Sequence, residues 1–156
     1  MALEGLDAVK RKMQALPDKV AYNAARRALR KGANVIRDKA RAGAARVNDP
    51  KTPETIAKNI VAQAGAKKYD RRRGGPAFRI GVLGGARDMS KYGEFKGAGK
   101  KNPGGDTWYW RFLEFGTSKM GAQPFMRPAM NQGADAAFSA TVTAMDVEFT
   151  KELNKL

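Results

Sequence analysis

The chain has no cysteine and no histidine, and only 15 of its 156 residues are aspartate or glutamate. Without cysteine there can be no disulfide scaffold and no thiolate ligand, and without histidine there is no imidazole ligand or histidine general base. The few carboxylates do not form a metal-binding or catalytic motif in the sequence. We therefore expect no metal, no cofactor and no enzymatic activity.

The sequence also has no stretch of about 18 consecutive apolar residues, so we expect no membrane-spanning helix. Its first residues lack the basic segment and apolar run of a secretory signal, and we expect synthesis in the cytoplasm. The glycines at 81–85 do not fit G-x-G-x-x-G, and no glycine precedes Lys-Ser or Lys-Thr at P-loop spacing. The glycine-rich stretches therefore indicate flexible tips and not a phosphate-binding loop.

Positive charge is abundant but unevenly distributed. The chain carries 30 lysines and arginines and a formal net charge of +15. Residues 107–156 contain 5 basic and 5 acidic residues, so the whole excess lies in residues 1–106. This asymmetry predicts a face or a set of loops directed at nucleic acid, at an acidic protein ring or at solvent.

Apolar residues at helical spacing predict three main helices. The first runs over residues 3–16 and ends at Pro17, and Asp18 can cap a second helix that extends to about residue 42. The alanine-rich stripe of this second helix indicates close packing against a partner helix or another subunit. The last helix covers roughly residues 126–152, where apolar residues from Phe138 to Leu153 recur every three or four positions.

Strands are expected between these helices. A short helix capped by Thr52 leads into strands at 60–66 and 77–83, and the aromatic run 107–115 is interpreted as a strand buried on both faces. The predicted fold class is α+β, with N-terminal helices, a small mainly antiparallel sheet with long loops, and a C-terminal helix packed on it. We expect one domain over residues 1–156, with a flexible insertion at about 84–106.

Two basic loops are candidates for contact with DNA or with an acidic partner. A solvated turn that protects a sheet edge is the competing interpretation. The first loop joins the two predicted strands and the second is the insertion, and their basic residues are Lys67, Lys68, Arg71, Arg72, Arg73, Lys91, Lys96, Lys100 and Lys101.

Glu114 lies at the end of the aromatic run, where a catalytic acid could be placed. No second carboxylate lies near it in the sequence, so an ion-pairing or turn-anchoring role is favoured. The aromatic residues at 108–112 could stack on bases, but packing in a core or an interface is favoured.

The segment 112–129 resembles the signature of the head–tail joining, or tail-completion, proteins of long-tailed phages. In that family an aromatic-rich segment precedes Glu-x-Gly-Thr, and a short loop leads to a Pro-Phe-x-Arg-Pro motif that begins the final helix. The start of the chain at 3–7 and the basic helix at 28–41 are also similar to the family. The matching residues of the joint are Glu114, Gly116, Thr117, Pro124, Phe125, Arg127 and Pro128.

The resemblance implies a structural virion protein of a siphophage. It implies a homohexameric ring at the neck between connector and tail tube, assembled from subunits made in the host cytoplasm. The implied partners are copies of itself, neighbouring neck, connector, tail terminator or tail tube proteins, and packaged DNA in the channel. A tail terminator that caps the tube and a basic nucleic-acid-binding protein are the alternatives. The insertion at 84–106 is longer than the family pattern predicts.

Overall fold

The computed structural model describes residues 5–65, 74–84 and 102–156. The chain divides into two compact units, one formed by residues 1–35, 62–79 and 134–156 and the other by residues 36–61 and 80–133. All of the candidate basic-loop residues lie outside the described residues, namely Lys67, Lys68, Arg71, Arg72, Arg73, Lys91, Lys96, Lys100 and Lys101.

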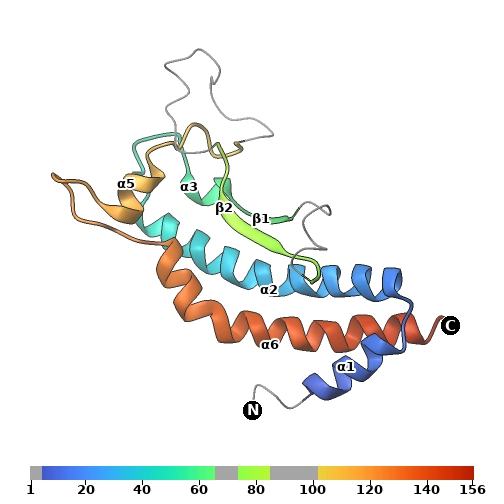
Figure 1. Ribbon diagram of the computed structural model, residues 1–156. Helices are drawn as coiled ribbons and strands as arrows, with labels where there is room; N and C mark the ends of the chain where they lie inside the picture. The colour runs from blue at the N-terminus through green and yellow to red at the C-terminus, as the bar shows by residue number, and fades with distance from the viewer. Residues whose placement is uncertain (1–4, 66–73, 85–101) are drawn as a thin grey trace. The chain divides into compact units, whose positions relative to one another are not determined.

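The first unit is a packing of three helices (Figure 1). It contains α1 (Leu6–Gln14), the first part of α2 (Asp18–Val47) and most of α6 (Met126–Leu153). Val9 and Leu16 are buried against three alanines of α2 and against Phe149 of α6, which is fully buried. The small alanine side chains allow this close helix packing, as the sequence predicts.

Gly32 of α2 marks the tightest helix contact in this unit. A Cβ atom on Gly32 would lie 2.0 Å from Thr141 Oγ1 and 2.6 Å from the carbonyl oxygen of Ala137. Both distances are far shorter than atoms tolerate, so only glycine fits. The backbones of α2 and α6 therefore approach each other here without an intervening side chain.

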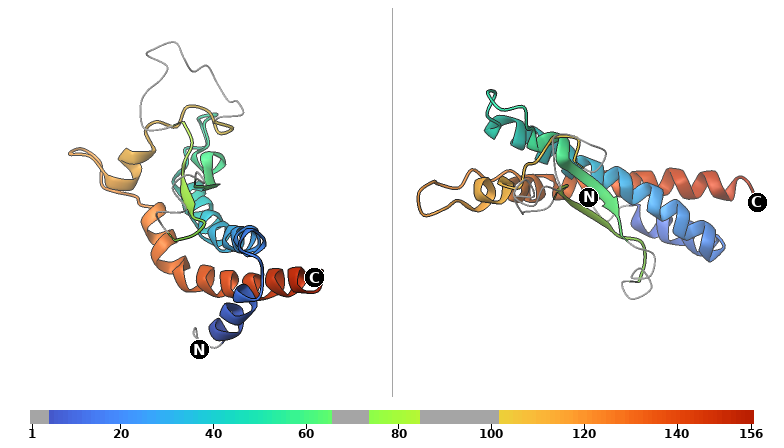
Figure 2. Two further views of the ribbon diagram at one scale, coloured as in Figure 1. Left: turned by 45° about the vertical axis from the view of Figure 1, so that its right-hand side comes forward. Right: turned by 90° about the horizontal axis from the view of Figure 1, so that it is seen from above.

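The two strands form a small antiparallel sheet, β1 (Ile60–Ala64) and β2 (Phe78–Val82), which lie side by side in Figure 2. The Gly65 N–H donates to the Ala77 carbonyl at 2.7 Å, and the Leu83 N–H donates to the Asn59 carbonyl at 2.8 Å. Both strands occupy the positions predicted from the sequence, with ends one or two residues shorter.

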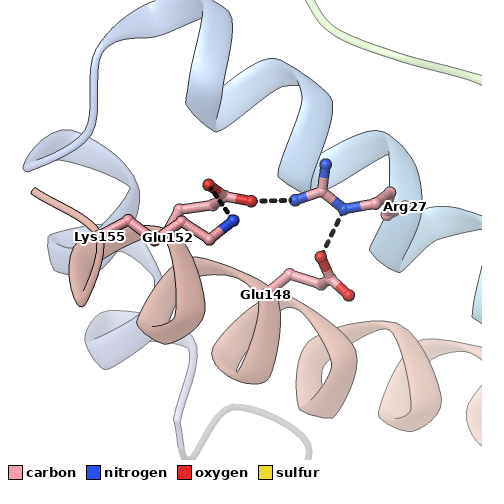
Figure 3. Close-up of polar contacts among 4 residues, drawn as sticks. All are labelled: Arg27, Glu148, Glu152 and Lys155. Atoms are coloured by element: carbon pink, nitrogen blue, oxygen red, sulfur yellow. Dashed lines mark hydrogen bonds and ion pairs between the residues drawn. The ribbon is translucent and has the colours of Figure 1, made fainter.

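Charged side chains join α2 and α6 on the surface of the first unit (Figure 3). Arg27 donates to Glu148 at 2.5 Å and to Glu152 at 2.6 Å, and Lys155 donates to Glu152 at 3.1 Å. The hydrogen bond to Glu148 is the main reason why the pKa of Arg27 is raised. Arg27 is nearly half exposed, so this network contributes less to stability than its short distances suggest.

The core of the second unit is built from α2, α3 (Ile56–Asn59) and the start of α6. Ile56, Ile60 and Phe125 are almost completely buried and pack with Ala40 and Ala44 of α2. The short helix begins after Thr55, three residues later than the sequence predicts, because Thr52 lies in the turn that follows α2.

The aromatic run is not a strand, which corrects the sequence prediction. Residues Trp110–Phe115 form the helix α5, with the Trp110 N–H bonded to Thr107 O and the Gly116 N–H to Phe112 O. Trp108 packs edge-on against Phe112, one helical turn further along, with 5.6 Å between the ring centroids. The apolar residues on both faces of the assumed strand are instead distributed around a helix whose side chains reach the core of the second unit.

The overall fold class is nevertheless α+β, as predicted. Among the described residues, α2 ends five residues beyond its predicted end and α6 runs over the predicted range.

The segment 102–106 lies at the end of the predicted flexible insertion, and it packs in the second unit: Asn102, Gly104 and Gly105 are buried. The predicted mobility of the insertion concerns residues 85–101, which lie outside the described residues. No helix in the described part of the chain is long and apolar enough to span a membrane.

Candidate functional site: a buried carboxylate between α5 and α6

Glu114 of α5 is the centre of a hydrogen-bonded joint in the second unit. Among the described residues it is the one buried charged residue, with a relative exposure of 1%. Its carboxylate accepts hydrogen bonds from the backbone N–H groups of Phe125 at 2.7 Å, Met126 at 2.9 Å and Arg127 at 3.0 Å. These are N–H groups at the start of α6, which have no partner within the helix itself. Glu114 therefore caps α6 from a different helix, eleven to thirteen residues earlier in the chain.

Arg127 completes the joint from the side of α6. Its Nε donates to Glu114 Oε1 at 3.2 Å, and one of its terminal nitrogens donates to the Glu114 carbonyl at 2.7 Å. The guanidinium also lies over the ring of Phe115, 5.3 Å from the centroid. One arginine thus binds the side chain and the backbone of Glu114 and covers the next residue.

The environment of Glu114 favours the charged carboxylate. Burial alone would raise its pKa, but the N–H groups of Met126, Phe125 and Arg127 and the Arg127 side chain lower the pKa below the ordinary value. The positive end of the α6 dipole acts in the same direction. A carboxylate held ionised by four donors is a poor proton donor, so this geometry supports anchoring and not acid catalysis.

The turn after α5 depends on Gly116. Its φ of 77° and ψ of 178° lie in a region that is essentially restricted to glycine. A Cβ there would also lie 2.9 Å from the N atom of Ala122 and 3.0 Å from the carbonyl oxygen of Met120. This positive φ lets the chain turn away immediately after the buried Glu114.

Thr117 shapes the loop that follows. Its hydroxyl accepts hydrogen bonds from the N–H groups of Lys119 and Met120, and its own N–H donates to the Met120 carbonyl at 2.8 Å. The Gln123 N–H then donates to the Leu113 carbonyl at 2.7 Å, which closes the base of the loop. We call residues 116–124 the joint loop.

The remaining residues of the predicted joint fix the start of α6. Phe125 is 2% exposed and belongs to the core of the second unit. Pro124 lies two residues before α6, and Pro128 lies in its first turn, where the missing N–H of proline costs no helical hydrogen bond. All seven predicted residues therefore lie within one structural joint.

The joint loop presents apolar side chains at its surface. Phe115, the last residue of α5 directly before the loop, is 65% exposed, and Met120 within the loop is 37% exposed. Lys119 lies between them in the sequence and is also exposed. Two apolar side chains and one positive charge are therefore exposed on a backbone that is held by hydrogen bonds.

Sequence reasoning missed a second buried polar cluster in this unit, centred on Asn59. Its amide donates to the Gly105 carbonyl at 2.9 Å and to Thr107 Oγ1 at 2.8 Å, and its carbonyl accepts from the Gly104 N–H at 2.7 Å. A Cβ on Gly104 would lie 2.0 Å from the Thr55 carbonyl oxygen. The cluster fixes residues 104–107 against α3, and no motif in the sequence points to it.

Comparison with known families identifies the chain. Residues 7–116 match the family HK97-gp10_like, described as "Bacteriophage HK97-gp10, putative tail-component". The chain belongs to this family. The match extends from α1 to the end of α5, so it contains Glu114 and Gly116 but not the other five residues of the joint. Neither the comparison with curated proteins nor that with solved structures gave a match.

The predicted resemblance to phage head–tail joining proteins is confirmed at the level of this tail-component family. The family supports a structural role in the phage tail, and hence in the virion. Among the described residues there is no cluster of acidic side chains suited to a metal ion.

Proposed function

We propose that the chain is a tail-completion, or head–tail joining, subunit that forms a ring at the neck of a long-tailed phage, between connector and tail tube. The observation that carries this proposal is the joint itself. All hydrogen bonds of the Glu114 carboxylate go to residues at the start of α6. The best-defined polar site among the described residues therefore has a structural role, because it holds a rigid surface in place.

The exposed residues of the joint support a docking role. Phe115 and Met120 remain accessible although Glu114, Gly116 and Arg127 hold the backbone around them. Surfaces that are ordered before binding lose little entropy when a partner docks. We therefore infer that the joint loop contacts a neighbouring protein of the neck or the tail.

The partners would be copies of the same chain in a ring, six by family resemblance, and the protein rings above and below it. Packaged DNA in the channel is a further partner, since the chain has a net charge of +15. The basic-loop residues from Lys67 to Lys101 remain candidates for contact with DNA or with an acidic ring. The subunits would be made in the host cytoplasm before assembly.

Replacement of the exposed loop residues tests this proposal in the phage that encodes the chain. Phe115→Ser combined with Met120→Ser should lower the unfolding free energy only modestly, because Phe115 is largely exposed apart from its contact with the Arg127 guanidinium and Met120 is partly exposed. Lysates should contain DNA-filled heads and tails of normal length that are not joined. Leu156→Ser is the matched control, since Leu156 is an apolar residue that is 80% exposed at the other end of the chain.

Electron micrographs of these lysates test the tail-terminator alternative, and a DNA-binding assay tests the nucleic-acid-binding alternative. A tail terminator limits the tube, so its loss should give tails of irregular length. A nucleic-acid-binding protein should bind DNA with an affinity that falls steeply with salt, by about one power of the salt concentration for each phosphate contact. Normal, fully joined particles from the double variant would contradict a docking role of the joint loop.

A further inference from the structure

A half-enclosed cavity of about 250 Å³ lies in the second unit, and its lining includes none of the seven residues of the Glu114 joint. Val47, Ile56 and Leu113 provide its apolar walls, and Asn48, Asp49, Thr52, Glu54 and Tyr109 provide its polar groups. Its volume is smaller than that of the usual pocket for a drug-sized ligand and suits a single side chain. We call this cavity the acidic pocket.

The acidic pocket is unusual because of the charge of the chain around it. Lysines and arginines outnumber acidic residues by 30 to 15, yet the residues that line the pocket include two carboxylates and no basic residue. In the part of the chain that the structure describes, neither Asp49 nor Glu54 forms an ion pair with a basic residue. The pocket is therefore a region of unbalanced negative charge on a strongly positive protein.

Tyr109 lies close enough to these carboxylates to be affected by their charge. Its pKa is raised, first by burial and then by the negative charges of Glu54 and Asp49, with a smaller effect from Asp106. The Tyr109 side chain is also hydrogen-bonded to Thr52. The phenol ring thus stands beside several carboxylates, an arrangement that attracts a cation both by charge and through the ring face.

The side-chain oxygen of Asn48 is a hydrogen-bond acceptor that has no donor among the described residues. The Asn48 amide nitrogen donates to the Asp49 carbonyl at 3.3 Å, but the Oδ1 atom is buried and accepts no hydrogen bond from the described residues. A buried acceptor without a partner is costly, and native proteins nearly always satisfy such atoms. An N–H donor that enters the pocket would satisfy it.

We propose that the acidic pocket binds the cationic end of a lysine or arginine side chain from a second copy of this chain. The apolar walls would receive the aliphatic stem, while Asp49, Glu54 and Asn48 Oδ1 would receive the N–H groups. This contact deepens the proposed function, since it rests on the self-association of the subunits in a ring.

Charge complementarity favours a second copy as the source. Two copies that each carry +15 repel each other unless their contact places basic side chains against the few acidic ones. The pocket and a basic side chain are different surface patches, so the contact can be heterologous and repeat from one subunit to the next. Contacts of this kind form closed rings when their rotation closes.

The binding chemistry can be tested without any assembly. Arginine amide added to the protein should shift the NMR signals of the Asn48 side-chain amide and of the Tyr109 ring, and the effect should saturate. Citrulline amide, which has nearly the same shape but no charge, should give at least tenfold weaker binding. Equal shifts with both compounds, or none with arginine amide, would overturn the proposed pocket.

The role of a second copy needs a separate readout. Asp49→Asn combined with Glu54→Gln keeps the size of both side chains, and it should weaken self-association at least tenfold in sedimentation experiments. Asp135→Asn together with Asp38→Asn removes the same charge at exposed positions and should have little effect. If the pocket variant associates as well as the control does, the pocket is not a subunit contact.

The absence of cysteine allows the occupant to be identified by crosslinking. Lys51→Cys introduces a unique thiol beside the pocket, to which a maleimide–benzophenone crosslinker can be attached. Illumination of mixed light and heavy isotope-labelled protein should give crosslinks between the two labels. Crosslinks within one label only would mean that the same chain fills the pocket. Binding of arginine amide without any self-association would keep the pocket but refute the ring.

Discussion

Replacement of Glu114 by glutamine should be among the most destabilising isosteric changes in this protein. Glutamine retains one carbonyl oxygen, which can accept the N–H groups of two residues at the start of α6. Its amide group, however, would point a donor at the remaining donors, which are the backbone N–H and the Nε of Arg127. The variant therefore loses hydrogen bonds, loses a charge and gains a repulsive contact in a site that is 1% exposed.

The expected cost follows from these contacts. A hydrogen bond to a charged group contributes about 1.5–3 kcal/mol, and loss of a helix cap costs about 1 kcal/mol. Two affected bonds therefore give a loss of roughly 3–5 kcal/mol in the free energy of unfolding. For a chain of this length, each kcal/mol corresponds to about 2–4 °C, so we expect the midpoint of thermal unfolding to fall by about 6–20 °C.

The pH dependence provides a second readout of the same residue. Because the pKa of Glu114 is lowered in the folded protein, its contribution to stability is fully present above the pKa of the unfolded chain, about 4.3. It is lost as the pH falls from that value through the folded pKa. The difference in unfolding free energy between wild type and the glutamine variant should therefore be constant at neutral pH and should decrease in acid.

Urea denaturation between pH 3 and pH 7 measures both effects. Glu148→Gln is the matched control, because Glu148 is less buried and pairs with the half-exposed Arg27 on the surface. It should change stability much less, and high salt should reduce its effect. A glutamine variant at position 114 within about 0.5 kcal/mol of wild type would refute the cap.

Three further substitutions test the fold around this site. Gly116→Val should prevent normal folding of the joint and abolish head–tail joining in the phage, while Gly121→Ala, where an added Cβ meets nothing within 4 Å, should be tolerated. Gly32→Ala should destabilise by about 1–3 kcal/mol in denaturant titrations, although alanine is the better helix former, because its Cβ would overlap Thr141 Oγ1. Asn59→Ala should cost about 2–4 kcal/mol by the same measurement, since it leaves buried partners at residues 104–107 unsatisfied.

The helices were predictable because their signals are local. Apolar residues three or four positions apart define α1 and α6, and Pro17 with Asp18 marks the boundary between α1 and α2. The predicted end of α2 lies five residues before the observed end at Val47. The chain there continues with alanine and arginine, both good helix formers, and Ala44 is fully buried in the second unit.

The misassignment of α5 has a definite physical cause. Trp108, Trp110 and Phe112 recur at every second position, as in a strand, and the six-residue helix Trp110–Phe115 is too short for helical periodicity to stand out against that pattern. Tertiary contacts determine that this segment is a helix and not a strand. The helix places Leu113 in the core of the second unit and aims the Glu114 carboxylate at the free N–H groups of α6.

The two buried polar sites differ in how far the sequence could reveal them. The turn-anchoring role of Glu114 could be predicted from the sequence, because Glu114 is an isolated acidic residue. It lies close to Gly116 and is followed by two prolines and an arginine, which indicates a turn that leads into a helix. The role of Asn59 could not be predicted, because its partners are backbone groups of Gly104 and Gly105, 45 and 46 residues away in the chain. Hydrogen bonds to backbone groups do not depend on the side chains of the partner residues, so the sequence contains no motif for them.

The acidic pocket could not be predicted from the sequence either, because its carboxylates follow α2 and its Tyr109 precedes α5. Its negative charge arises where these segments meet, so a chain with a net charge of +15 can still contain an acidic pocket.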